Sequence, residues 1–143
     1  MRKIEAQMVC AVRDRLIEDL ADWRSGNTEV RTEYGEIQPE LTLGQGKVVV
    51  VYLFGNKIAE FDTSLNHARA CRGLMITDAG WQTATTKSRL NALLGCFYGG
   101  MHLCQVKGEW LLNTTPFAGT DWVSFGWRGE DSWVCQQAEA LAA

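Results

Sequence analysis

The sequence predicts an α+β fold, in which a mostly antiparallel sheet packs against an N-terminal helix, a central helix at about residues 86–98 and a short C-terminal helix. Three observations support this class: helical spacing near the N-terminus, strand-like alternation from Thr28 onward, and several short apolar runs separated by glycine turns. The 143 residues include two prolines, and we find no linker or repeat. We therefore expect a single domain over residues 1–143.

The N-terminal helix is predicted from apolar residues that recur every three or four positions, namely Ile4, Met8, Val12, Leu16, Leu20 and Trp23. Gly26 would end this helix as a C-terminal cap. From Thr28 to Tyr34 the spacing changes to two, which predicts a strand with one exposed face.

The centre of the sheet is predicted at Val48 to Phe54, a run that is apolar on both faces and rich in β-branched residues. Gly55 and Asn56 follow as a two-residue hairpin turn of type II′, leading into a strand from Lys57 to Phe61. Weaker strands are expected at Ile37 to Leu43, where Pro39 favours a sheet edge, and at Leu74 to Thr77. Residues 62–73 fit a short helix or a loop.

The central helix is expected to begin at Thr85 or Thr86 as its cap and to bury a stripe formed by Leu90, Leu93, Leu94 and Phe97. Gly99 and Gly100 would stop it. The remaining elements are strands at Met101 to Val106, Trp110 to Thr114 and Trp122 to Trp127, the first two joined around Gly108 and Glu109, and a final helix from Ser132.

Composition favours a protein of the host cytoplasm that does not enter a membrane. The longest apolar run, Val48 to Phe54, is too short to span a bilayer, and charged residues interrupt the region that a signal peptide would need. The five cysteines are odd in number and widely spaced, so we expect reduced thiols that pack in the core. The net charge of −3 is too small to indicate a general DNA coat or an acidic mimic of DNA.

Residues 52–94 resemble a family of small proteins from tailed bacteriophages and prophages. The matching blocks are Leu53 to Glu60 and, more specifically, Ala79 to Leu94, which contains a glycine, an aromatic residue and the run Thr-Ala-Thr-Thr-Lys-Ser-Arg-Leu-Asn. A weaker match continues through Gln105 to Leu112, so that about half of the chain is covered. The resemblance implies a phage origin and carries over no catalytic residue.

The best functional lead is the start of the central helix, because a helix N-terminus attracts anions and this one is followed by Lys87 and Arg89 instead of acids. We predict binding of nucleic acid or another phosphate-bearing ligand there, with Trp81 stacking on a base. The candidate ligand-binding residues are Trp81, Thr83, Thr85, Thr86, Lys87, Ser88, Arg89 and Asn91. We expect Lys87 and Arg89 to matter more for binding than for stability. The competing interpretation is structural: Thr85 or Thr86 only caps the helix, Lys87 and Arg89 are solvated, and Trp81 packs in the core.

A second class of function is a protein-binding module that inhibits or modifies a host factor, such as a defence or transcription component, through Trp122, Trp127 and Trp133. No catalytic residue is predicted and an enzyme is disfavoured, because no nucleophile signature or phosphate-binding glycine loop occurs. A zinc site from His67, Cys71, His102 and Cys104 would lack the usual paired cysteine spacing, so we predict no metal and no cofactor.

Overall fold

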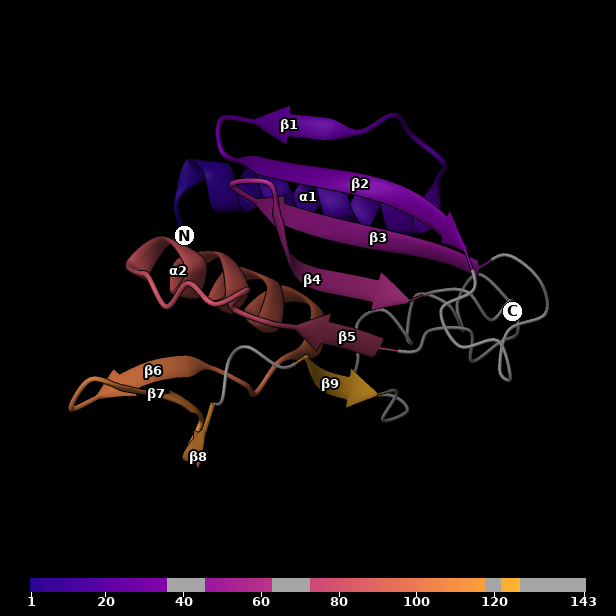
Figure 1. Ribbon diagram of the computed structural model, residues 1–143. Helices are drawn as coiled ribbons and strands as arrows, with labels where there is room; N and C mark the ends of the chain where they lie inside the picture. The colour runs from indigo at the N-terminus through magenta and orange to yellow at the C-terminus, as the bar shows by residue number, and fades with distance from the viewer. Residues whose placement is uncertain (36–45, 63–72, 118–121, 127–143) are drawn as a thin grey trace.

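Two helices and two antiparallel sheets make up the part of the chain that the computed structural model describes, residues 1–35, 46–62, 73–117 and 122–126 (Figure 1). The predicted α+β class is confirmed. The expected strand at 37–43, the segment 63–72 and the helix from Ser132 lie outside the described residues. None of the helices that are described is long and apolar enough to cross a membrane.

The larger sheet has six strands in the order β1-β2-β3-β4-β5-β9, and every neighbouring pair is antiparallel. Its strands are β1 (Trp23–Ser25), β2 (Thr28–Gly35), β3 (Gly46–Leu53), β4 (Asn56–Asp62), β5 (Gly73–Ile76) and β9 (Val123–Gly126). The strand predicted for the middle of the sheet is β3, and it lies between β2 and β4.

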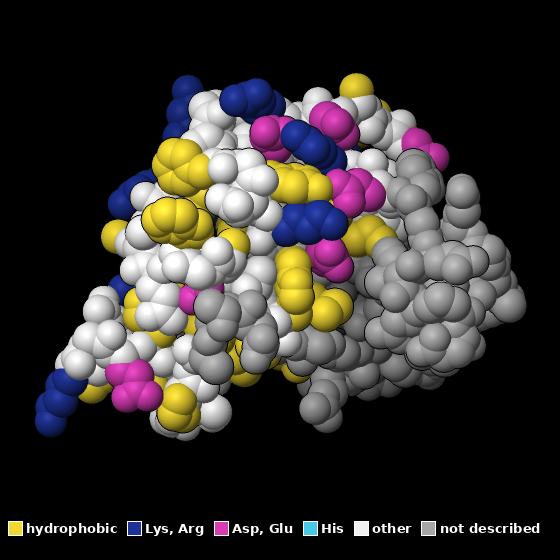
Figure 2. Space-filling view, in the orientation of Figure 1, with side chains coloured by type: hydrophobic (Ala, Val, Ile, Leu, Met, Phe, Trp, Pro, Cys, Tyr) yellow, Lys and Arg dark blue, Asp and Glu magenta, His cyan; other side chains and the backbone are white. Residues whose placement is uncertain are grey.

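Both faces of β3 are buried, as its apolar run predicts. Val49, Val51 and Leu53 belong to the main core, whereas Val48, Val50 and Tyr52 form a second small cluster on the opposite face. Charged side chains surround that second cluster: Arg31 lies over the Tyr52 ring at 4.5 Å, and Lys57 pairs with Glu33 at 3.4 Å. Figure 2 shows basic and acidic side chains interleaved on this face of the molecule.

The helices α1 (Lys3–Ile17) and α2 (Ala84–Leu93) bury their apolar residues in the same main core. A π-helical turn, η1 (Leu94–Tyr98), continues α2, so this helical segment ends where the sequence predicts. The second sheet contains β6 (Leu103–Val106), β7 (Glu109–Leu112) and β8 (Thr115–Pro116). Its buried residues Leu103, Trp110 and Leu112 join the same core, next to Phe117.

The N-terminal helix is shorter than predicted: it ends at Ile17, where the Glu18 amide donates to the Asp14 carbonyl at 2.9 Å. The Arg15 guanidinium donates to the carbonyl oxygens of Ala11 and Ala21, which turns the chain after Ile17. Trp23 then pairs with Val30 in the sheet. Gly26, expected to cap the helix, is instead in the turn between β1 and β2 with φ of 58°.

The cysteines do not all pack in the core as predicted. Cys10 is exposed on α1, and Cys96 and Cys104 are partly exposed, all three as free thiols. Cys10 lies on the outer side of α1, between the buried residues Val9 and Ala11, so the helical repeat turns it away from the sheet.

Candidate functional site

Two large aromatic side chains are exposed near the start of α2. Phe54 is 68% exposed and Trp81 is 62% exposed, although the fold offers a large core that aromatic residues usually join. In Figure 2 exposed hydrophobic side chains gather on this side of the molecule, over the turn between β3 and β4 and the chain leading into α2. The two residues belong to two different turns.

Phe54 occupies the tight turn between β3 and β4. Leu53 pairs with Asn56, so the turn residues are Phe54 and Gly55, with φ of 52° and 78°. Two positive φ values define a type I′ turn, one residue earlier than the predicted Gly55-Asn56 turn of type II′. A bulky residue rarely adopts this conformation, so the turn holds the Phe54 ring out into solvent at a local cost.

Trp81 follows a second turn of the same kind, which is built by Asp78. The Trp81 amide donates to the Asp78 carbonyl at 2.9 Å, and Ala79 and Gly80 between them have φ of 57° and 88°. The Asp78 carboxylate strengthens the turn, since its Oδ1 accepts from the Gly80 amide at 2.7 Å. Trp81 therefore follows the turn with its ring exposed. It is not packed in the core, contrary to the structural interpretation of the sequence.

A pocket of about 360 Å³ opens between these two turns and α2. Its apolar wall is formed by Leu53, Phe54, Ile58, Ala79 and Trp81. Four polar residues complete the lining, namely Asn56, Asp78, Thr83 and Thr86. This volume and mixture of apolar wall and few polar groups are typical of small-molecule sites.

The first turn of α2 lies against this pocket and has free hydrogen-bond donors. The cap is Thr83, whose hydroxyl accepts from the Thr86 amide at 3.2 Å; the predicted caps, Thr85 and Thr86, are already inside the helix. No hydrogen bond to the Ala84 or Thr85 amide occurs within the described residues. The first turn contains no acid, and Lys87 follows at the fourth helical position, partly exposed. These groups favour an anion.

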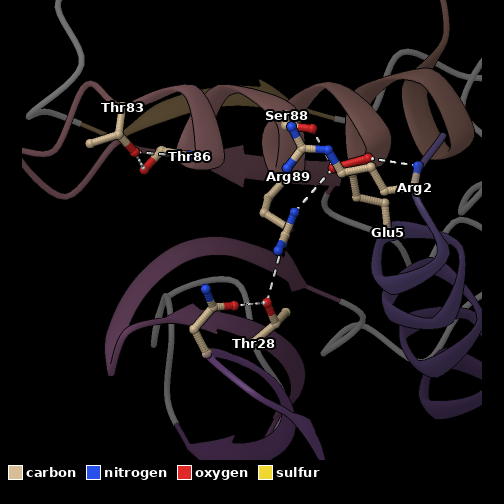
Figure 3. A network of polar contacts seen from close by, with 8 residues as sticks. Arg2, Glu5, Thr28, Thr83, Thr86, Ser88 and Arg89 are labelled. Carbon is tan, nitrogen blue, oxygen red and sulfur yellow. Dashed lines mark hydrogen bonds and ion pairs between the residues drawn. The ribbon is translucent and has the colours of Figure 1, made fainter.

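Arg89 lies about one turn further along the helix, and its side chain extends into the protein toward Thr28 and Glu5 (Figure 3). It is 4% exposed, and its Nη1 is 3.1 Å from Glu5 Oε2 on α1 while its Nε donates to Thr28 Oγ1 on β2 at 3.2 Å. The structure thus gives Arg89 partners within the fold, and a ligand cannot reach a guanidinium that is enclosed by its own partners, which argues against the expectation that Arg89 contributes more to binding than to stability.

Glu5 is the acceptor at the centre of this network. Burial raises the pKa of Glu5, but hydrogen bonds from the Ser88 hydroxyl and the Arg2 amide, together with the charge of Arg89, outweigh it and hold that pKa below its ordinary value of 4.5. Ser88, another candidate ligand residue, is thus engaged with Glu5.

Asn91 is also occupied by the fold. Its side-chain amide donates to the Leu103 carbonyl at 2.9 Å and accepts from the Leu103 amide at 2.7 Å, so it binds β6 as a neighbouring strand would. This contact attaches the second sheet to α2.

The structure thus brings together part of the predicted set. Trp81, Thr83 and Thr86 line the pocket, with Thr85 and Lys87 on the adjoining first turn, whereas Ser88, Arg89 and Asn91 bind other elements. Sequence reasoning missed Phe54, Asn56 and Asp78. Phe54 and Asn56 flank Gly55 in a hairpin turn, where an aromatic residue is unusual, and that position was the available signal.

No group of three or more metal-ligating side chains occurs within the ranges that the structure describes. His67 and Cys71 lie outside those ranges. His102 is exposed, and Cys104 is near the Asn113 carbonyl at 3.7 Å.

A family model described as Kyanoviridae Gp96 protein matches residues 1–133. No curated protein and no solved structure matches the chain.

Proposed function

The chain belongs to the Kyanoviridae Gp96 protein family, a family of phage proteins, and from that premise we propose that it binds unpaired nucleotides of a nucleic acid. In this proposal a base enters the pocket between Phe54 and Trp81, and a neighbouring phosphate binds at the first turn of α2. The supporting observation is the pair of exposed aromatic side chains on a pocket that adjoins free helix amides.

The conformation of Phe54 supports a binding role over a folding role. A non-glycine residue with φ of 52° costs about 1–3 kcal/mol, and exposing the ring gives up the stabilisation that its burial would bring. Asparagine, aspartate or glycine would make the same turn without either cost. We therefore expect a bound ligand to cover the Phe54 ring.

The base and the phosphate of a nucleotide match two neighbouring surfaces, the aromatic pocket and the first turn of α2. Bases stack on aromatic side chains whatever their sequence, and each stacked base contributes about 1–3 kcal/mol. Thr83 and Thr86 belong both to the pocket lining and to the start of α2, so a base in the pocket places its sugar and phosphate toward the amides of Ala84 and Thr85.

The charges of the protein favour contact with a few phosphates of a nucleic acid over an extended contact along a duplex. Lys87 is the cation on this turn that the fold leaves unpaired, because no ion pair of Lys87 occurs among the described residues whereas Arg89 is bound to Glu5. With a net charge of −3, the protein cannot rely on many phosphate contacts. We expect single strands to bind better than duplexes, because stacking requires an unpaired base.

The test is fluorescence anisotropy with labelled single-stranded and double-stranded oligonucleotides at low salt. Trp81→Ala and Phe54→Ala should each weaken single-strand binding by about tenfold or more, as the loss of one stacking contact predicts. Both variants should melt at nearly the wild-type temperature, since both rings are exposed.

Val106→Ala is the matched control, because Val106 is an exposed apolar residue on the separate β6–β7 hairpin. It should bind as the wild type does. Undetectable binding by the wild type, or equal binding by Trp81→Ala, would contradict the proposal.

A second candidate is binding of a host protein through the same aromatic region. Trp122 is 37% exposed and lines a shallow hollow with Asn56, Lys57 and Ala79, next to the pocket. Exposed tryptophans often anchor protein interfaces. A pull-down from infected cells separates the two candidates: a single host protein that survives nuclease treatment and is lost with Trp122→Ala favours the second.

A further inference from the structure

We infer that Asp78 makes the pocket select guanine, through the two adjacent N–H donors on the edge of that base. This inference rests on the proposed function, because it names which base the nucleotide pocket prefers. Three observations carry it: the burial of the carboxylate, its place in the pocket wall and its incomplete hydrogen bonding.

Asp78 is 2% exposed, yet it lines the pocket with its side chain among mostly apolar neighbours. Carboxylates are seldom this deeply buried unless they are paired, since removal from water penalises their charge. No salt bridge to Asp78 occurs in the described part of the chain, so no cation of that part offsets the charge.

One of the two carboxylate oxygens is used by the fold and the other is not. Oδ1 accepts from the Gly80 amide at 2.7 Å and so maintains the turn that presents Trp81. Oδ2 has no hydrogen-bond partner among the described residues and is not one of their fully enclosed, unsatisfied atoms, and Asp78 lines the pocket. A ligand that displaces water from the pocket would therefore need to supply a donor to this acceptor.

Guanine fits this requirement because its N1–H and N2–H are parallel neighbouring donors: one can pair with Oδ2, and the other with the second lone pair of Oδ1, which the Gly80 amide leaves available. Uracil and thymine instead place acceptors on either side of a single N–H, so Asp78 would face their carbonyl oxygens. Adenine and cytosine offer one amino group beside an acceptor nitrogen. The expected order of affinity is therefore guanine first, then adenine or cytosine, and uracil last.

The experiment is calorimetric titration of the wild type with four probes: GMP, IMP, AMP and UMP. IMP is the sharpest comparison, because its base is guanine without the 2-amino group and keeps N1–H. The wild type should bind IMP about tenfold more weakly than GMP, the change expected for one charge-assisted hydrogen bond, and UMP more weakly still.

Asp78→Asn tests the same contact from the protein side. Asparagine keeps the oxygen that accepts from the Gly80 amide and replaces the other oxygen with an N–H donor, so the turn is preserved while the group facing the ligand is reversed. The variant should lose its preference for GMP over IMP and bind UMP better than the wild type does. If the variant does not fold, the comparison of GMP with IMP on the wild type still decides the inference.

The outcomes separate this inference from the proposed function. Equal binding of all four nucleotides would overturn guanine selection and leave nucleotide binding in place, whereas no binding of any would overturn both. Argininamide provides the last check, because a guanidinium also pairs with a carboxylate and stacks on aromatic rings. Tighter binding of argininamide than of GMP would overturn the inference in favour of an arginine from a protein partner.

Discussion

The first two turns of α2 contribute to two groups of polar residues that differ in how far the fold uses their hydrogen-bonding groups. In the inner group, Arg89, Glu5, Ser88 and Thr28 bond to one another across three elements; Arg89, Glu5 and Thr28 are buried, and Ser88 is partly exposed at the edge of the group. In the outer group, the amides of Ala84 and Thr85 and one oxygen of Asp78 keep unused hydrogen-bonding capacity beside exposed rings. A basic residue near the start of a helix can thus either stabilise the fold or remain available to a ligand, depending on which side chains it contacts in the folded protein.

The largest effect should come from breaking the inner group. Arg89→Met leaves Glu5 buried without its cation, and loss of one partner of a buried ion pair typically costs about 3–5 kcal/mol. Chemical denaturation should show this loss as a lower midpoint with a similar slope. Lys87→Met is the matched control, two residues earlier in the same helix, and should change stability by less than about 0.5 kcal/mol. Equal stability of the two variants would mean that Arg89 contributes no more to the fold than Lys87 does.

The attachment of the second sheet should be the next most sensitive point. Asn91→Leu deletes both hydrogen bonds to Leu103 and leaves its backbone groups without their partner, at a cost of about 1–3 kcal/mol. Hydrogen exchange should show faster exchange of the Leu103 amide, while amides of β3 keep their protection. Protection at Leu103 that equals the wild type would mean that another group replaces Asn91.

A smaller, pH-dependent effect should also come from the inner group. The pKa of Glu5 lies below its ordinary value of 4.5 in the folded protein, so the unfolded chain binds the proton more readily. The stabilisation from this group is therefore present above pH 4.5 and lost as pH falls through the folded pKa. Denaturation midpoints measured between pH 6 and pH 3 should fall more steeply for the wild type than for Glu5→Gln. Parallel curves would show that the Glu5 carboxylate does not drive the acid response.

The smallest effect should be found in the outer group. Lys87→Gln removes one phosphate contact of the proposed complex, which should flatten the dependence of log affinity on log salt by about 0.7 units for a single strand. Affinity should fall only modestly, because stacking remains. Anisotropy titrations at three or more salt concentrations measure this slope. If this slope is the same in Lys87→Gln and the wild type, the phosphate does not bind next to Lys87.

Much of the sheet could be predicted from the sequence, since its signals are local. The run of valines in β3 is apolar on both faces, and the structure buries both; the alternation in β2 likewise matches its pairing. The sequence predicts the position of the hairpin, but the turn lies one residue earlier than predicted, because Phe54 adopts a positive φ that its propensity disfavours.

The site was less predictable, because its decisive contacts join residues far apart in the chain. Arg89 pairs with Glu5 across 84 positions and with Thr28 across 61, and no local spacing indicates such partners. The start of α2 was placed late because the capping threonine, Thr83, is followed by two further threonines with the same propensity. The structure places Trp81, an aromatic residue that the sequence analysis names, on the pocket wall, whereas no local pattern indicates that Asp78 lies there too.

The contact between Asn91 and β6 also occupies backbone groups at an edge of the second sheet. The unpaired backbone at the edge of a sheet is a template onto which another chain can add a strand and begin to aggregate. Leu103 turns its amide and carbonyl toward that edge, and the Asn91 side chain occupies both groups. At the other edge of the same sheet, β8 has two residues and one of them is Pro116, which has no amide proton to offer. At Leu103 on one edge and at Pro116 on the other, the second sheet therefore offers no free amide donor with which a strand of another chain could pair.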